Sequence, residues 1–305
     1  MASERLTPPS RALELRTPLI AASGTVGSVW EWAEVADVGS FGGAVAKSVA
    51  PEPWPGRPEP RLAPMSTGML NGIGIQNPGI RQWKDSMADR IPRLRVPIWG
   101  SAVASDSDGF LVVASGLAEA GVSAVEINLS CPNLDDGRLF SFDGDASASV
   151  IRAVREILRI PIGAKLSPNT PDIVGVASAC LEAGADFLIL TNTALGFGID
   201  IKSRRPMLSG GTGGYSGPGL KPISLRCVYE VSTHIPEAFI VGCGGVSTGA
   251  DVIEYIMAGS SAVELGTVLL AEPNAGRRIL DELESELVRL GASSVTELIG
   301  SVNRW

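Results

Sequence analysis

The sequence predicts an α/β protein in which eight parallel strands close into a (β/α)8 TIM barrel, with long insertions at its C-terminal face. Short β-rich apolar runs alternate with longer helical patterns along nearly the whole chain. The length of 305 residues suits one barrel with insertions, so we expect a single domain over residues 1–305. An open doubly wound sheet is the alternative, but no G-x-G-x-x-G follows the first strand.

The expected strands are short runs rich in apolar and β-branched residues. They lie near residues 18–22, 43–47, 98–103, 124–129, 162–166, 187–190, 239–242 and 262–265. The longer segments between and after them have the apolar spacing of helices. These lie near residues 30–36, 80–90, 108–120, 147–158, 172–183, 222–233, 251–258 and 275–290.

Two long loops interrupt this alternation. Residues 51–64 (PEPWPGRPEPRLAP) are rich in proline and continue into GMLNGIGIQNPG at 68–79. Residues 193–220 contain SGGTGGYSGPG, whose six glycines indicate tight or mobile backbone. Both are either irregular linkers or functional lids and binding loops, since loops this long inside a compact domain are often functional.

Charge and composition exclude several classes of function. The net charge of −8 disfavours binding to nucleic acid or to an anionic membrane, which require clustered Lys and Arg. The N-terminal MASERLTPPSR has no apolar segment typical of a signal peptide. No apolar run approaches the roughly 18 residues that span a bilayer. We therefore expect a cytoplasmic protein.

Cysteine and histidine are scarce and scattered. Cys131, Cys180, Cys227 and Cys243 form no C-x-x-C pair, so we expect no disulfide framework and no zinc or iron–sulfur site within this chain. Cys180 and Cys227 are expected to be buried and apolar. The one histidine, His234, falls at the end of a predicted helix, where a cap or surface role is favoured over catalysis.

In barrel enzymes the active site forms at the C-terminal ends of the strands. In chain order, those ends supply Ala22, Ser23, Gly24 and Thr25; Lys47 and Ser48; Gly100 and Ser101; Asn128, Cys131 and Asn133; Lys165 and Ser167; Thr191, Asn192 and Thr193; Gly242, Gly244 and Gly245; and Gly266 and Thr267. Two lysines at one barrel mouth suggest an anionic ligand. Glycines after the last two strands let backbone N–H groups approach a phosphate.

No carboxylate is expected at the end of any of these strands. That argues against a glycosidase, which needs a carboxylate pair, and against a metal site built on Asp and Glu. Amides, lysines, a thiol and a phosphate-binding turn remain. This set of groups fits flavin chemistry, in which the cofactor transfers electrons and the protein moves one proton.

These residues resemble the dihydroorotate dehydrogenase family, class 1, over nearly the whole chain. The matching motifs, in the family's order, are ASGT (22–25), AKS (46–48), GMLNGIGIQNPG (68–79), NLSCPN (128–133), AKLSPN (164–169), TNTALGFGID (191–200), GGYSGPGLKP (213–222), GCGG (242–245) and GT (266–267). The first long motif and NLSCPN are the specific ones. The 68–79 segment is more similar to class 1B than to class 1A.

The resemblance implies FMN across the barrel mouth, with Cys131 as the catalytic base. The implied FMN-binding residues are Ala22, Ser23, Lys47, Ser48, Ser101, Asn128, Lys165, Thr191, Gly217, Gly244, Gly245, Gly266 and Thr267. The implied substrate-binding residues are Lys47, Met69, Leu70, Asn71, Asn128, Asn133, Asn192 and Thr193. The implied reaction is oxidation of (S)-dihydroorotate to orotate in pyrimidine biosynthesis. Asparagines suit a pyrimidine because each offers one donor and one acceptor.

Two departures from the family leave the substrate open. Ser101 stands where the family commonly has Asn, and the loop after NLSCPN carries Asp135 and Asp136. The alternatives are another dihydropyrimidine or enone-like substrate, or a barrel that binds flavin without catalysis.

The electron acceptor is open as well. The class 1B likeness implies a homodimer and a separate subunit with FAD and a [2Fe–2S] cluster that passes electrons to NAD. Direct use of fumarate, as in class 1A, is the alternative.

Overall fold

The computed structural model describes residues 4–9, 12–129 and 140–303. Eight parallel strands form a closed barrel in the order β1–β14–β13–β8–β7–β6–β5–β2. Their bounds are β1 (Leu19–Ala21), β2 (Gly43–Val45), β5 (Ile98–Ala102), β6 (Ala124–Asn128), β7 (Ile162–Leu166), β8 (Phe187–Leu190), β13 (Ile240–Cys243) and β14 (Ala262–Leu265). The predicted fold class is confirmed, and each strand lies where the sequence predicts it.

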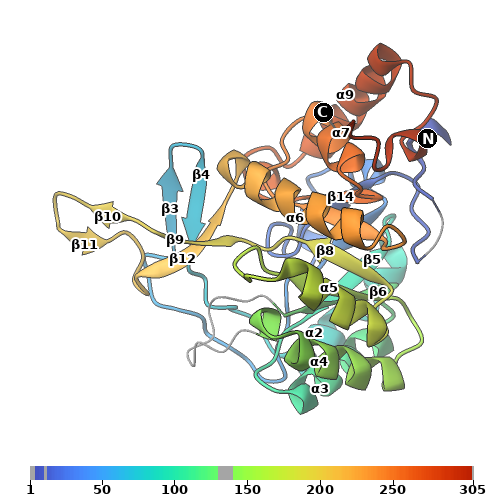
Figure 1. The fold of residues 1–305 in the computed structure, drawn as a ribbon. Coiled ribbons are helices and arrows are strands. Elements are labelled where there is room, and N and C mark those ends of the chain that lie inside the picture. The colour runs from blue at the N-terminus through green and yellow to red at the C-terminus, as the bar shows by residue number, and fades with distance from the viewer. Residues whose placement is uncertain (1–3, 10–11, 130–139, 304–305) are drawn as a thin grey trace.

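Helices flank the barrel, above and below it in Figure 1. They are α1 (Trp30–Ala33), α2 (Ile80–Met87), α3 (Ser107–Glu119), α4 (Gly144–Ile157), α5 (Ile173–Glu182), α6 (Lys221–His234), α7 (Gly249–Met257), α8 (Val268–Ala271) and α9 (Ala275–Leu290). Several begin at side-chain caps: Asp106 and Asp172 accept hydrogen bonds from backbone N–H groups in the first turns of α3 and α5. The predicted helices are confirmed, and the short α8 is an addition to them.

Short 3-10 helices complete the helical elements: η1 (Glu4–Leu6), η2 (Val38–Ser40), η3 (Ile91–Arg93), η4 (Phe140–Phe142), η5 (Pro218–Leu220) and η6 (Thr296–Leu298). Within the part of the chain that the structure describes, no helix has both the length and the apolar character needed to cross a bilayer. His234 is exposed at the end of α6, with Nδ1 2.8 Å from the carbonyl oxygen of Glu230. This position agrees with the surface role expected for it.

The two insertions form strands that the sequence analysis missed. β3 (Leu62–Met65), β4 (Gly68–Asn71), β12 (Thr212–Ser216) and β9 (Ala194–Phe197) make an antiparallel sheet in that order. β10 (Ile199–Asp200) and β11 (Arg205–Pro206) make a separate hairpin. Glycine at position 213 permits close strand contact, because a Cβ there would lie 2.4 Å from the carbonyl oxygen of Asn71. Gly213 therefore serves close packing of β12 against β4.

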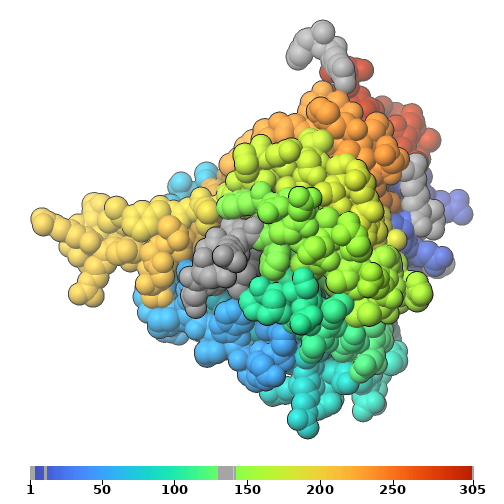
Figure 2. Space-filling view, turned by 60° about the horizontal axis from the view of Figure 1, so that its bottom comes forward, coloured from blue at the N-terminus to red at the C-terminus, as the bar shows by residue number. Residues whose placement is uncertain are grey.

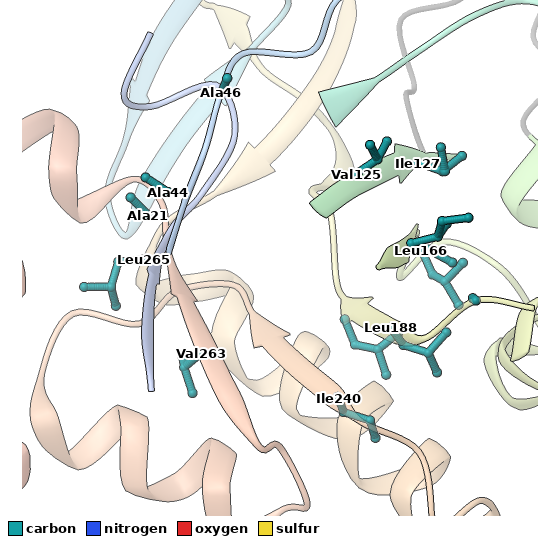
Figure 3. Packing of buried hydrophobic residues seen from close by; sticks show 14 of the residues in the cluster. Ala21, Ala44, Ala46, Val125, Ile127, Leu166, Leu188, Ile240, Val263 and Leu265 are labelled. Carbon is teal, nitrogen blue, oxygen red and sulfur yellow. The ribbon is translucent and has the colours of Figure 1, made fainter. Parts of the chain in front are cut away.

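Apolar side chains form one layer outside the barrel, against the helices, and a second layer inside it. Side chains at alternate strand positions point outward and pack against the helices; Figure 3 shows Val125, Ile127, Leu188 and Val263 among them. The inward side chains form a second cluster in which Trp99 and Phe187 meet with ring centroids 5.2 Å apart. The barrel interior is thus a packed core, and polar groups are confined to its other end.

The β10–β11 hairpin projects beyond the rest of the molecule, to the left in Figure 2. Large apolar side chains are exposed on it and on the adjoining strands: Leu62, Met65, Leu195, Phe197, Ile199 and Ile201. Contiguous exposed apolar surface on a soluble domain commonly marks a protein contact. The two insertions therefore form a sheet and a hairpin that expose apolar side chains to solvent.

Phe187→Ala tests the packed barrel interior. Removing this fully buried ring leaves a cavity beside Trp99, and we expect a loss of ~3–5 kcal/mol in the free energy of unfolding. Urea denaturation followed by tryptophan fluorescence measures it. Phe197→Ala, on the exposed face of β9, is the matched control and should change stability by under ~0.5 kcal/mol. Equal losses in the two variants would contradict the assignment of the core.

Candidate active site

A cavity of ≈ 350 Å³ opens at the C-terminal mouth of the barrel. Its walls come from the strand ends and from the antiparallel sheet, which contributes Met69, Asn71 and Ser216. Sixteen predicted site residues line it: Ala22, Ser23, Lys47, Ser48, Met69, Asn71, Asn128, Lys165, Thr191, Asn192, Thr193, Gly217, Gly244, Gly245, Gly266 and Thr267. The structure thus brings together in one space residues spread over most of the sequence.

Two described residues of the predicted site, Ser101 and Leu70, do not line the cavity, and two more predicted residues cannot be placed. Ser101 is fully buried below the cavity. The Leu70 side chain packs with Ala63 and Leu208 in a small apolar cluster of the antiparallel sheet, away from the cavity. Cys131 and Asn133 fall outside the described residues.

One wall of the cavity is built from amide side chains. Asn128, the last residue of β6, accepts a hydrogen bond on Oδ1 from Asn192 Nδ2 at 3.3 Å. Asn192 Oδ1 in turn accepts the backbone N–H of Thr193 at 2.8 Å. Asn71, from β4, donates to the carbonyl oxygen of Gly214 at 3.2 Å. These bonds fix the orientation of the amides, so the wall presents donors and acceptors in set positions.

The other end of the cavity is built from glycine backbone. Gly217, Gly244 and Gly245 all have positive φ (98°, 133° and 72°), a conformation that side chains rarely adopt. A Cβ at position 245 would lie 2.7 Å from the backbone nitrogen of Lys221. At Gly266 the nearest atom to such a Cβ would be 3.8 Å away, so a side chain there would enter the cavity. The cavity therefore depends on glycine at these positions.

Backbone N–H groups supply the donors at this end. Among the described residues, no acceptor is found for the amides of Gly245, Gly266 and Thr267. The nearby Lys221 is engaged elsewhere, with Nζ 2.6 Å from Asp251 and 3.0 Å from Glu254. Unpaired backbone amides near the start of a helix favour an anion such as a phosphate. This end of the cavity can therefore hold an anionic group such as a phosphate.

The floor of the cavity holds a buried ionic triad of Glu126, Lys165 and Glu264. Lys165 Nζ lies 3.1 Å from Glu126 Oε2 and 3.0 Å from Glu264 Oε2. Both carboxylates are fully buried, and the lysine side chain is 6% exposed. Ser101 donates to Glu126 Oε1 at 3.0 Å. Glu126 and Lys165 line the cavity from below, so charged groups lie directly under the ligand space.

The triad corrects two interpretations of the sequence. The sequence suggests Lys165 as one of two cations for an anionic ligand, but two carboxylates of the chain already bind it. No carboxylate ends a barrel strand, as the sequence predicts, yet Glu126, two residues before the end of β6, lines the cavity. Strand alternation explains this, because residue 126 shares the inward face with Asn128. Strand ends without a carboxylate therefore do not exclude a carboxylate in the cavity.

The triad perturbs the protonation of its members. Burial raises the pKa of Glu126 and Lys165 opposes it, leaving the pKa at about 7. Burial alone would lower the pKa of Lys165, but attraction by the two carboxylates raises it above its ordinary value. Burial, and then the charge of Glu264, raise the pKa of the Cys243 thiol well above its ordinary value. Near neutral pH the triad thus holds an ammonium group and one readily protonated carboxyl group.

Glu126, Glu264 and Cys243 are the site residues that sequence reasoning missed. A signal for the glutamates was present: AVEIN and AVEL each place one charged residue on the inward face of an otherwise apolar strand. A charge is rarely fully buried without a partner, so each pattern predicts a buried ion pair. Cys243 ends β13 as a free, buried thiol that lines the cavity. Cys180 and Cys227 are buried in the apolar core, as predicted.

The pKa of Glu126 predicts how stability depends on pH. A glutamate in an unfolded chain has a pKa near 4.3. Between that value and about 7, the folded protein binds more protons than the unfolded one. Stability should therefore fall as pH rises from 5 to 7, by on the order of 1 kcal/mol per pH unit. In Glu126→Gln this fall should disappear, as measured by urea denaturation across pH 5–8.

Glu119→Gln is the control for loss of one carboxylate, since Glu119 is exposed and pairs with Lys84 on the surface. It should keep the fall in stability. A flat profile in the unmodified protein, or an unchanged slope in Glu126→Gln, would contradict the assignment.

Comparisons with known proteins agree with this geometry. The family model described as "Dihydroorotate dehydrogenase" matches residues 8–287. A Listeria monocytogenes protein named "Dihydroorotate dehydrogenase B (NAD(+)), catalytic subunit" is 39% identical over 290 residues, which cover 94% of each chain. A Pelobacter propionicus protein of the same name is 39% identical over 295 residues, covering 95% of this chain and 96% of the relative.

Among solved structures, a DHODH of Eimeria tenella in complex with ferulenol superposes with a TM-score of 0.84. The match covers 98% of this chain and 89% of the other at 24% identity, and it supports the fold alone. The family rests on the sequence matches, which extend over nearly the full chain and share the name of a class B catalytic subunit. The chain belongs to the dihydroorotate dehydrogenase family.

Proposed function

We propose that this chain oxidises dihydroorotate to orotate in pyrimidine biosynthesis, as one FMN-binding barrel domain over residues 1–305. The observation that carries the proposal is the division of the mouth cavity into an amide wall and a glycine-lined phosphate end. The identity of 39% to relatives named as catalytic subunits of dihydroorotate dehydrogenase B also supports the proposal.

The amide wall suits a dihydropyrimidine ring, which presents donors and acceptors in alternation. Asn71, Asn128 and Asn192 line the cavity with amide groups, which can donate and accept hydrogen bonds without adding charge. Asn133, the fourth asparagine implied by the resemblance, joins them in the proposal, and Lys47 supplies a cation for the substrate carboxylate. A site of this kind rejects analogues that leave its buried amides unpaired.

FMN fits the remaining space. Gly217, Gly244, Gly245, Gly266 and Thr267 would hold its phosphate on backbone N–H groups. The ring would be held by the strand ends around the triad, with contacts from Ala22, Ser23, Lys47, Ser48, Asn128, Lys165 and Thr191. When bound, FMN accepts the hydride that leaves the substrate. The protein's part is to bind both molecules, orient them and remove one proton.

Cys131 is the proposed base for that proton, on carbon 5 of the substrate. A thiol, with its ordinary pKa near 8.5, loses its proton more readily than a hydroxyl, so more of its basic form is present near neutral pH. Nearby cations increase this thiolate fraction further. Lys47 lines the cavity and supplies such a charge. The buried Cys243 is unsuited to the role because burial raises its pKa well above the ordinary thiol value.

The proposed route for electrons leads to NAD through a second protein. The relatives are named as catalytic subunits of an NAD(+) enzyme, which implies a separate partner. We propose that this partner carries FAD and a [2Fe–2S] cluster, and that the chain forms a homodimer. The exposed apolar side chains on the antiparallel sheet and its hairpin offer surface for protein contacts.

Flavin content and reduction test the proposal directly. The purified chain should be yellow, with about one noncovalent FMN per barrel. Anaerobic addition of dihydroorotate should bleach the flavin absorbance, while dihydrouracil, which lacks the carboxylate, should bleach it far more slowly. A protein that takes up no FMN would refute the flavin assignment, and bleaching by dihydrouracil alone would move the proposal to another dihydropyrimidine.

Cys131→Ala should keep the flavin but slow its reduction by dihydroorotate roughly 10²–10⁴-fold, the usual contribution of a general base. Cys131→Ser should retain slight activity, mainly at high pH, because a hydroxyl is a much weaker acid than a thiol. Stopped-flow absorbance measures both rates. Cys180→Ala, at a buried position remote from the cavity, is the control. Unchanged rates in Cys131→Ala would remove this thiol as the base.

The isolated chain should reduce artificial dyes or oxygen at the expense of dihydroorotate, but it should not reduce NAD. Steady-state assays with NAD, fumarate and a dye distinguish the electron acceptors. Efficient NAD reduction by the chain alone would contradict the need for a partner. Fumarate turnover near the rate with dye would instead indicate direct use of fumarate.

A further inference from the structure

The buried triad carries more negative than positive charge, and the proposed oxidation of dihydroorotate gives the extra carboxylate no role. Lys165 contributes one positive charge, while Glu126 and Glu264 contribute two negative charges when both are ionised. The enclosed group therefore carries a net charge of −1, or zero when one carboxyl group is protonated. Such an excess charge is costly away from water, so a proton on one carboxyl group is favoured.

Access from the cavity selects Glu126 as the carboxyl group that changes protonation. Its Oε2 bonds Lys165 and its Oε1 accepts from Ser101, and it lines the cavity floor. Glu264 lies off the cavity lining, beside the thiol of Cys243 on the neighbouring strand. Lys165, Glu264 and Cys243 are the titratable groups that face Glu126 from the packed strands, and Lys47 is the cation at the mouth.

A line of hydroxyl groups connects Glu126 with the cavity wall. Ser101 donates to the carboxylate, and its Oγ lies 2.9 Å from Ser48 Oγ. Ser48 lines the cavity, 3.4 Å from Ser23 Oγ and from Asn128 Nδ2. Hydroxyl groups both donate and accept, so a proton can pass along this line to a carboxyl group that solvent does not reach.

We propose that Glu126 is a positioning residue that takes up a proton when negative charge develops on a flavin bound above Lys165. The inference rests on the proposed function. Transfer of a hydride to the flavin delivers two electrons and one proton and leaves one negative charge on the ring. A second proton then passes from solvent to the Glu126 carboxylate, and no other bond forms or breaks. Lys165 thereby keeps its full positive charge available to the reduced flavin.

The flavin midpoint potential reports this proton. Below the pKa of Glu126, about 7, the carboxyl group is already protonated and takes up no further proton when the flavin is reduced. Above it, reduction consumes two protons for two electrons, so the potential should fall twice as steeply with pH as for one proton. The potential of a flavin without such a group falls less steeply at high pH than at low pH, because the reduced ring then loses its own second proton.

The experiment measures the midpoint potential of the FMN-loaded protein with mediator dyes from pH 6 to 9. The unmodified protein should show the steeper slope above pH 7. Glu126→Gln should show the one-proton slope throughout and a more positive potential at pH 9, because it removes a buried negative charge. It should also bind sulfite, an anion that adds to oxidised flavin, at least tenfold more tightly at pH 9.

Glu119→Gln is the control and should match the unmodified protein, because its carboxylate lies on the surface paired with Lys84. A one-proton slope above pH 7 in the unmodified protein overturns the inference, even if no Glu126 variant folds. So does a steep slope that persists in Glu126→Gln. Dithionite reduces the flavin without dihydroorotate, so these outcomes are separate from failure of the proposed substrate, whereas failure to bind FMN would refute the proposed function itself.

Discussion

The architecture of the site depends on the burial of one ammonium group inside a parallel barrel. Lys165 is almost fully enclosed, and an isolated charge there would be strongly destabilising. Two inward glutamates compensate for this charge: Glu126 from the neighbouring strand β6, and Glu264 from β14, which lies three strands away in the barrel order. The ionic layer divides the interior into an apolar half packed around Trp99 and a polar half open to ligand. The floor of the cavity is the upper surface of that layer.

Above this floor, the cavity separates two kinds of recognition without using many charges. Neutral amides on one side read donor and acceptor positions, and bare backbone on the other side receives an anion. This separation would let an acidic chain hold the proposed cofactor and substrate, both anionic, at one mouth. The overall charge of −8 therefore does not exclude an anion at the mouth, where Lys47 and the glycine backbone line the cavity.

The sequence predicts the barrel strands well because each one is a local signal, a short apolar run of fixed length. The gathering of Ser23, Asn128 and Gly245 at one mouth also follows, since parallel strands in a barrel share their C-terminal end. The antiparallel sheet does not follow, because its register pairs Asn71 with Gly214 across a long stretch of chain.

The triad was missed for a related reason. A single glutamate in AVEIN indicates a buried charge but does not identify its partner on another strand. The roles of Cys131 and Asn133 stay predictions, since both fall outside the described residues. Local patterns thus specify where functional side chains gather, whereas their pairing depends on contacts between distant strands.

Closure of the barrel has a consequence for how the chain is made. Leu19 of β1 pairs with Val263 of β14, so the first strand finds its last neighbour only when most of the chain exists. During synthesis, β1 and β13 each present an unpaired edge, and the cation of Lys165 has only one of its carboxylates. Contacts of such large sequence separation slow folding, and open edges promote association between chains. While the chain is still being synthesised, it therefore exposes strand edges that the finished barrel conceals. Chaperones can bind these edges during that time.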